Sequence, residues 1–145
     1  MTIQKVLFAF ALAVALSGVP SFAQCAQSPL AGHWVANDPN TRGVTRAEIG
    51  VGCCDQILNG VPVCSPPDSV HLFGKCHPND CDWGAQSGHF QNGSGNQLNL
   101  SINQGFVVRT INIRRSGALL RLRIASHYTD HSGRPDRTSI EFLKR

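Results

Sequence analysis

The sequence predicts an all-β protein of about eight antiparallel strands, closed into an up-and-down β-barrel and preceded by a cleaved N-terminal signal helix. Three observations support this prediction. Apolar residues alternate with polar ones in short runs, turn-forming residues separate the runs, and beyond residue 23 no segment keeps the 3.6-residue period of a helix. A barrel is favoured because closure removes exposed strand edges, and a β-sandwich is the alternative.

Residues 1–23 have the three parts of a secretory signal peptide. Lys5 provides the positive charge, residues 6–16 form an apolar run of eleven, and Ser21 and Ala23 place small residues at the cleavage site. The run is shorter than the roughly 20 residues that span a bilayer, although an uncleaved anchor is the alternative. We therefore expect cleavage after Ala23, no transmembrane segment after cleavage, and a periplasmic or extracellular protein.

Residues 24–145 are expected to form a single domain, because 122 residues suffice to bury one core. Residues 52–67 are rich in Cys and Pro and show little periodicity. This composition predicts a loop or an added hairpin that disulfides hold in place of core packing.

The exported domain is only mildly basic. Removal of the signal peptide takes away one basic residue, Lys5, and leaves 12 basic and 9 acidic residues, a formal charge of +3. A nucleic-acid-binding domain usually concentrates its basic residues in a stripe, so no nucleic-acid partner is predicted. The densest basic group is expected on the solvated outer faces of two neighbouring strands and comprises Arg114, Arg115, Arg121 and Arg123.

All six cysteines lie in the exported domain, and an even number in a small exported protein predicts a disulfide framework. A tight turn at Pro78 and Asn79 brings Cys76 and Cys81 within bonding range, so these two are the expected pair. The pairing of the other four stays open, and they are Cys25, Cys53, Cys54 and Cys64.

The eight expected strands are residues 33–36, 44–51, 69–75, 84–90, 98–102, 106–115, 118–128 and 137–144. In the second of them, Ala47 and Ile49 are expected to face the core, whereas Glu48 is expected to face outward. The fifth has apolar residues at period two, beginning at Leu98 and Leu100. Short turns containing Asn, Ser and Gly join the later strands.

The strand at 118–128 has the clearest alternation. One face is expected to carry Leu120, Leu122, Ile124, Ser126 and Tyr128, and the other Arg121, Arg123 and His127. In the last strand, Thr138, Ile140 and Phe142 alternate with Ser139 and Glu141. Glu141 is therefore expected on the outward face, as is Glu48, and the two do not form a catalytic carboxylate pair.

Two likenesses follow from these residues. Gly32-His33-Trp34, at the start of the first strand, resembles the Gly-X-Trp opening of the calycin barrels, the avidins and lipocalins. Residues 37–46 and 74–84 are similar to an uncharacterised family of exported bacterial proteins with an NPxTRGITR…GKCHPxDCDWG pattern, and residues 129–134 are similar to its TDxSGR piece. The resemblance implies a small β-barrel and no catalytic residues, and the segment with Cys53, Cys54 and Cys64 lies outside it.

The segment at 76–81 is the predicted recognition element. Its small disulfide ring is expected to present His77, Asp80, Asp82 and Trp83 at one end of the barrel for ligand binding. The alternative is a structural turn, in which the two Asp side chains accept hydrogen bonds from nearby backbone amides and Trp83 packs beneath them.

No metal site and no cofactor are predicted. Cys76 and Cys81 lack the paired CxxC spacing of a zinc site, and an oxidising compartment favours disulfides. An alternative metal site would consist of His77, Asp80 and Asp82, with His71 as a possible fourth ligand. No Gly-X-Ser-X-Gly elbow marks a nucleophilic serine.

The leading prediction is a non-enzymatic binding module that takes a small ligand or a protein partner at a loop-bearing end. The alternatives are a protease-inhibitor-like or envelope interaction protein, and a secreted hydrolase or metal-dependent enzyme. Barrel binding predicts a lined cavity on the order of a few hundred cubic ångströms. Loop recognition predicts a filled barrel with exposed Trp83 or Phe73, and an enzyme predicts a histidine bonded to a carboxylate inside a cleft.

Overall fold

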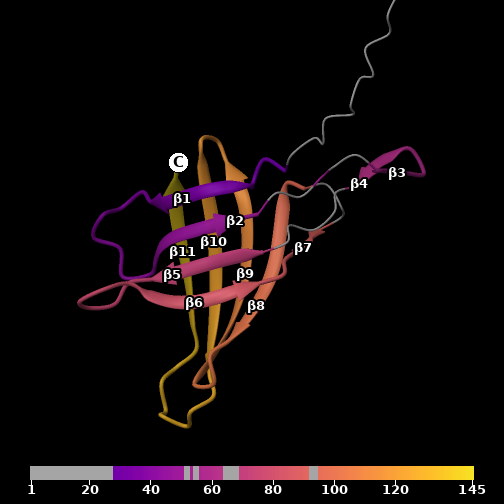
Figure 1. Ribbon diagram of the computed structural model, residues 1–145. Helices are drawn as coiled ribbons and strands as arrows, with labels where there is room; N and C mark the ends of the chain where they lie inside the picture. Colours follow the sequence, from indigo (N-terminus) through magenta and orange to yellow (C-terminus); the bar gives the residue numbers. More distant parts are fainter. Residues whose placement is uncertain (1–27, 51–52, 54–55, 64–68, 92–94) are drawn as a thin grey trace, which may run out of the picture.

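The computed structural model describes residues 28–50, 53, 56–63, 69–91 and 95–145 (Figure 1). The predicted signal peptide, together with Cys25, Cys54 and Cys64, lies outside the described residues. No helix in the described ranges is long and apolar enough to cross a membrane.

The described residues form an all-β structure. Its strands are β1 (Gly32–Ala36), β2 (Val44–Ile49), β3 (Gln56–Leu58), β4 (Val61–Val63), β5 (Val70–Gly74), β6 (Cys81–Gln86), β7 (His89–Phe90), β8 (Gln97–Asn103), β9 (Val107–Ser116), β10 (Leu119–Tyr128) and β11 (Arg137–Lys144).

One antiparallel sheet contains all of these strands except β3 and β4, in the order β6-β5-β2-β1-β11-β10-β9-β8-β7. The first and last strands, β1 and β11, pair with each other at Val35 and Lys144. The sheet curls until β6 lies against β8, and this seam is its one unpaired junction among the described strands. The eight longer strands form a nearly closed barrel, which confirms the predicted fold and is consistent with a calycin-like barrel.

The core fills the barrel with the apolar face of each long strand. Ala47 and Ile49 are buried as predicted, and so are Leu98 and Leu100. The fully buried larger side chains include Leu30, Trp34, Leu72, Leu98, Ile102, Ile111, Ile113, Leu120, Leu122 and Leu143. The alternation in the sequence therefore identified the buried face of most strands.

Trp34 packs at the end of the barrel where the described chain enters and leaves. Its indole Nε1 donates a hydrogen bond to the Leu30 carbonyl at 2.9 Å. The guanidinium groups of Arg115 and Arg145 lie 4.8 and 4.7 Å from its ring centroid, and Arg145 also donates to the Ala31 carbonyl at 2.8 Å. The segment around Trp34 thus connects the start of the first strand to Arg145, which follows the last strand.

The prediction that Arg115 faces outward was wrong. Directly paired residues of antiparallel strands point to the same face, and Arg115 pairs with Leu120, which is fully buried. Its guanidinium therefore lies inside the barrel over Trp34. Arg114, its neighbour, pairs with Arg121 and is exposed as expected.

The predicted outward position of Glu141 was also wrong. Glu141 pairs with Leu122, and Leu143 pairs with Leu120, so the buried face of β10 brings Glu141 to the interior. The apolar Ile140 and Phe142 face outward and are 50% and 41% exposed. β11 therefore presents its more polar face to the barrel interior.

The expected strand at 84–90 is two strands. β6 begins at Cys81 and pairs with β5 on one side of the seam, whereas the two-residue β7 pairs with β8 on the other side. Gly88 lies between them, and a Cβ at this position would collide with the side chain of Leu98. The chain therefore needs a glycine where it crosses from one edge of the sheet to the other.

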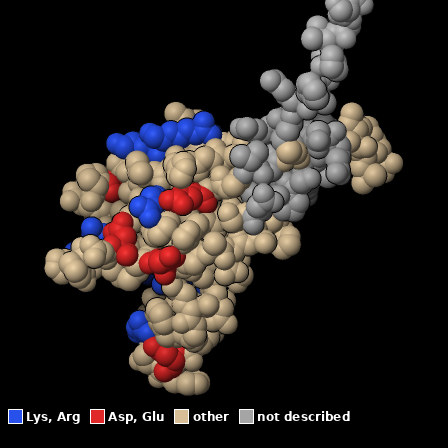
Figure 2. All heavy atoms as spheres, in the orientation of Figure 1, with Lys and Arg blue, Asp and Glu red and all other residues tan. Residues whose placement is uncertain are grey.

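The predicted loop or hairpin at 52–67 contains a hairpin made of β3 and β4, which stands apart from the barrel in Figure 1. Asn59 and Gly60 have φ of 52° and 78°, as tight hairpin turns require. Ile57 and Leu58 at its tip are 74% and 65% exposed. The outer face of the barrel instead carries interspersed charges, as Figure 2 shows, including Arg46 paired with Glu48 at 3.3 Å.

Candidate functional site

Four connections meet at one end of the barrel, and we call it the loop-bearing end. They join β1 to β2, β5 to β6, β8 to β9 and β10 to β11, because alternate turns of an up-and-down barrel lie at the same end (Figure 1). A cavity of about 130 Å³ opens here, and we call it the end pocket. It is lined by Arg42, Gly43, Trp83, Arg109, Ile124, Ser126, Tyr128, Arg137, Ser139 and Glu141.

Trp83 forms one wall of the end pocket. It projects inward from β6 and packs against the buried core. A Cβ on Gly74, which lies on the neighbouring strand β5, would collide with the Trp83 indole. The indole therefore occupies space that only a glycine at position 74 leaves open.

Glu141 enters the end pocket from β11 in a similar way. A Cβ on Gly43 would collide with its carboxylate. Its Oε2 accepts a hydrogen bond from the Thr41 hydroxyl at 2.9 Å, and the Thr41 hydroxyl accepts one from the Gly43 amide at 3.0 Å. The β1–β2 connection thus fixes the position of the carboxylate.

Arg109 projects inward from β9. Its guanidinium carbon lies 4.2 Å from the centroid of the Trp83 ring, which is within range of a cation–π interaction. Its Nη1 is buried without a hydrogen-bond partner among the described residues. Burial lowers the pKa of this guanidinium from its ordinary value, yet it stays charged, since an arginine in a protein does not lose its proton.

Residues 129–134 form a rim beside the end pocket. The Asp130 carboxylate accepts a hydrogen bond from the Ser132 amide at 3.2 Å and forms an ion pair with Arg134. The Arg134 guanidinium lies 4.2 Å from the ring centroid of Tyr128, which lines the pocket. Hydrogen bonds from Ser132 lower the pKa of Asp130, so its carboxylate stays ionised, and the ion pair persists, to a lower pH than an ordinary aspartate would allow.

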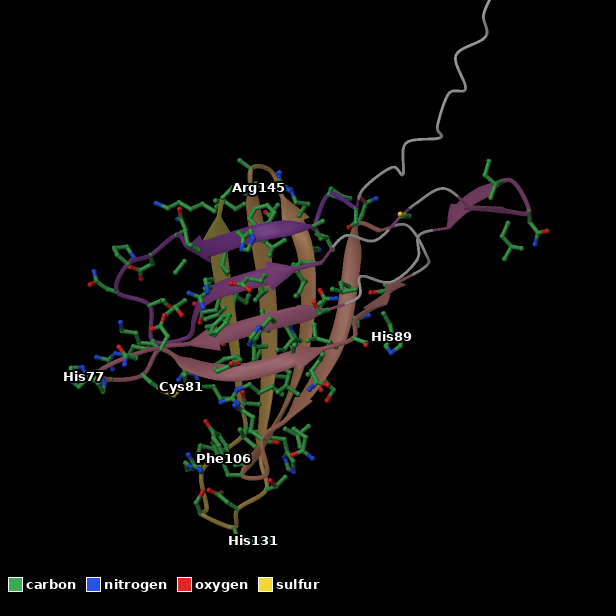
Figure 3. All side chains as sticks on the ribbon, in the orientation of Figure 1. His77, Cys81, His89, Phe106, His131 and Arg145 are labelled. Atoms are coloured by element: carbon green, nitrogen blue, oxygen red, sulfur yellow. A yellow bond between two sulfur atoms is a disulfide. The ribbon has the colours of Figure 1, made fainter. Side chains whose placement is uncertain are left out.

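The predicted recognition residues point in different directions. His77 and Asp80 are exposed at the tip of the β5–β6 loop, away from the barrel (Figure 3). Asp82 lies on the outer face, 2.6 Å from Nε2 of His71, and this hydrogen bond is the main reason that its pKa is lowered. Of the four, only Trp83 reaches the end pocket.

Sequence reasoning did not select Arg109 or Glu141 as site residues. The signal that was present is the inward face of the strand at 118–128, which changes from Leu and Ile to Ser126 and Tyr128 near its end. A polar end on the inner face of a barrel strand indicates an open, lined interior rather than a packed core.

The expected pair Cys76–Cys81 is confirmed as a disulfide with Cα atoms 5.4 Å apart. Cys53 is disulfide-bonded as well. None of the described cysteines is free.

Replacing both Cys76 and Cys81 with Ser should lower the free energy of unfolding by about 2 kcal/mol, because the ring they close is short. Trp83 should keep its place, since the space over Gly74 does not depend on the disulfide. Urea denaturation under non-reducing conditions measures the loss, with Asn79→Ser in the same loop as the control. Complete loss of folding would contradict this estimate.

Two histidines bond to carboxylates on the outer face. His71 pairs with Asp82, and His127 pairs with Asp136 at 2.9 Å beside a groove of about 380 Å³. The side chains of His127 and Asp136 are 67% and 65% exposed. Bulk water therefore screens the pair, which lacks the sheltered cleft expected of a general base. Within the described ranges, no three His, Cys, Asp or Glu side chains are grouped so that they could hold a metal ion.

No protein-family model, no curated protein and no solved structure matches the chain. The chemistry of the end pocket is therefore the basis for inferring a function.

Proposed function

We propose that the protein is an exported, non-enzymatic binding module that takes a small ligand with an anionic group into the end pocket. The observation that carries this proposal is the buried Nη1 of Arg109, which has no hydrogen-bond partner among the described residues. Leaving a buried donor unsatisfied destabilises a protein by about 1–3 kcal/mol, and more for a charged group. A carboxylate or similar anion supplies the missing acceptor and matches the planar fork of a guanidinium.

The charges around the end pocket favour an anion. Arg42 and Arg137 are exposed at its edge and Arg109 lies inside, whereas Glu141 is the one carboxylate in its lining. A concave site with mostly positive walls raises the local concentration of anions and speeds their entry.

The size of the end pocket limits the ligand. Its volume of about 130 Å³ is below the few hundred cubic ångströms expected for barrel binding. The ligand, or the part of it that enters, is therefore small.

Loop recognition, the competing prediction, required an exposed Trp83 or Phe73. Trp83 is half-buried against the core. Phe73 is also half-buried, with the Arg46 guanidinium 3.7 Å from its ring centroid. Ile57 and Leu58 are exposed at the hairpin tip, and this apolar surface still favours contact with a protein partner.

The resemblance to the exported bacterial family supports the same site. Its three sequence pieces meet at the loop-bearing end. The first piece provides Thr41 and Gly43, which position Glu141, and the second provides Gly74 and Trp83. The third is the rim at residues 129–134.

Arg109→Met should abolish anion binding. Titration with acetate, a minimal carboxylate, should shift the indole N–H resonance of Trp83 in NMR spectra, while that of Trp34, the only other tryptophan, serves as an internal reference. In Arg109→Met the Trp83 shift should be lost. The ligand-free variant should also be more stable to urea, by up to about 1 kcal/mol, since a buried unpartnered donor is gone.

Two control variants outside the end pocket test whether acetate binds specifically at Arg109. Arg123→Met removes an exposed arginine and should leave acetate binding unchanged, as should Ile57→Ser at the hairpin tip. If acetate leaves Trp83 of the native protein unaffected at concentrations up to tens of millimolar, the proposed function is wrong.

A further inference from the structure

The end pocket contains two opposite charges that do not pair with each other. Arg109 enters it from β9 and Glu141 from β11, with β10 between them. Among the described residues, neither side chain forms an ion pair within 4.0 Å. A guanidinium and a carboxylate that share a small cavity would attract each other strongly, so their separation needs a structural reason.

The reason lies in how each side chain is held. Trp83 lies against the guanidinium of Arg109 on its side of the pocket. The Thr41 hydroxyl and the bare backbone of Gly43 hold the Glu141 carboxylate on the other. Both groups are thus fixed in place, and each still lacks a counterion.

We propose that the ligand is a small zwitterion, whose carboxylate binds Arg109 and whose ammonium group binds Glu141; this inference rests on the proposed function. A simple dianion meets repulsion from Glu141, and a simple cation meets repulsion from Arg109 and from Arg42 and Arg137 at the edge. A molecule with both charges satisfies both fixed groups, each by a charge-assisted hydrogen bond.

The rest of the lining fits the same class of ligand. The hydroxyls of Ser126 and Ser139 can hydrogen-bond to a carboxylate, and Ile124 offers apolar contact for a short aliphatic chain. A volume of about 130 Å³ admits only a small molecule. This describes small amino acids in which one to three carbons separate the amine from the carboxylate.

The test is NMR titration of the full exported chain with glycine, β-alanine and 4-aminobutyrate, compared with acetate and methylammonium as probes of one charge each. At least one zwitterion should bind about tenfold more tightly than acetate, as expected for one added charge-assisted hydrogen bond. Glu141→Gln should remove this advantage while acetate still binds. Glu48→Gln, on the outer face, should change neither.

The outcomes are distinguishable. If acetate binds through Arg109 but no zwitterion binds more tightly, or if Glu141→Gln leaves the ratio unchanged, the zwitterion inference is wrong and the proposed function stands. If methylammonium binds as well as the zwitterions, the inference is also wrong. If no probe perturbs Trp83, both proposals are wrong. An unchanged Trp34 resonance verifies that Glu141→Gln remains folded.

Discussion

Trp34→Ala is expected to lower the free energy of unfolding by about 3–5 kcal/mol, the range for replacing a buried large aromatic side chain. Trp34 is fully buried, and its Nε1 bonds to the Leu30 carbonyl. The substitution also removes the ring beside which Arg115 and Arg145 lie, so both guanidinium groups lose their cation–π contacts. Because small domains have only about 5–15 kcal/mol of stability in total, the variant should be marginally folded.

Val35→Ala is the matched control. Val35 is the next residue of β1, faces outward and is 44% exposed, so its truncation should change stability by no more than about 0.5 kcal/mol. Urea denaturation followed by far-ultraviolet circular dichroism measures both variants without relying on tryptophan fluorescence. A loss below about 1 kcal/mol for Trp34→Ala would mean that the ring does not anchor the core.

The fold was predictable because burial imposes a period of two on each barrel strand. The alternation at 118–128 identified Leu120, Leu122 and Ile124, and all three are buried. Barrel closure could be argued from the number of strands and the short connections between them. These signals are local, because each can be identified in one stretch of the sequence without knowing which strands pair.

Where both faces of a strand carry apolar residues, pairing with the neighbouring strand decides which face is buried. In β11, Ile140 and Phe142 made one face the more apolar, but pairing with β10 turned Glu141 and Leu143 inward. The register between strands is a property of the whole sheet, and the sequence of β11 alone does not contain it. Arg115 in β9 is a different case, because it lies two residues beyond Ile113 and four beyond Ile111, so the pleat of the strand alone already places it on the buried face.

The candidate site was harder to predict than the fold. Asp82 and Trp83 are adjacent in the chain, yet Asp82 lies on the outer face and Trp83 on the inner one, as the pleat of β6 requires. Conversely, Arg109 and Glu141 lie on strands separated by β10 and share the end pocket only because the sheet is curved. Proximity along the sequence suggested a site at the disulfide loop, whereas the barrel interior brings together residues from distant strands.

Gly74→Ala is expected to lower the free energy of unfolding by about 1–3 kcal/mol, as overpacking of a filled interior does. The new methyl group would occupy the position of the Trp83 indole, so the ring has to move. Its displacement would take away the wall beside which Arg109 lies. The variant should therefore lose acetate binding as well as stability.

Trp83→Leu tests whether the collision itself causes the loss. If Gly74 matters because it makes room for the indole, the double variant Gly74→Ala with Trp83→Leu should be more stable than the sum of the two single effects predicts. A coupling of about 1 kcal/mol or more is expected for side chains in direct contact. Strict additivity would show that Gly74 serves the backbone of β5 and not the pocket. A coupling of that size would mean that the missing side chain at Gly74 allows the Trp83 ring to pack against the core and, by doing so, shapes the end pocket.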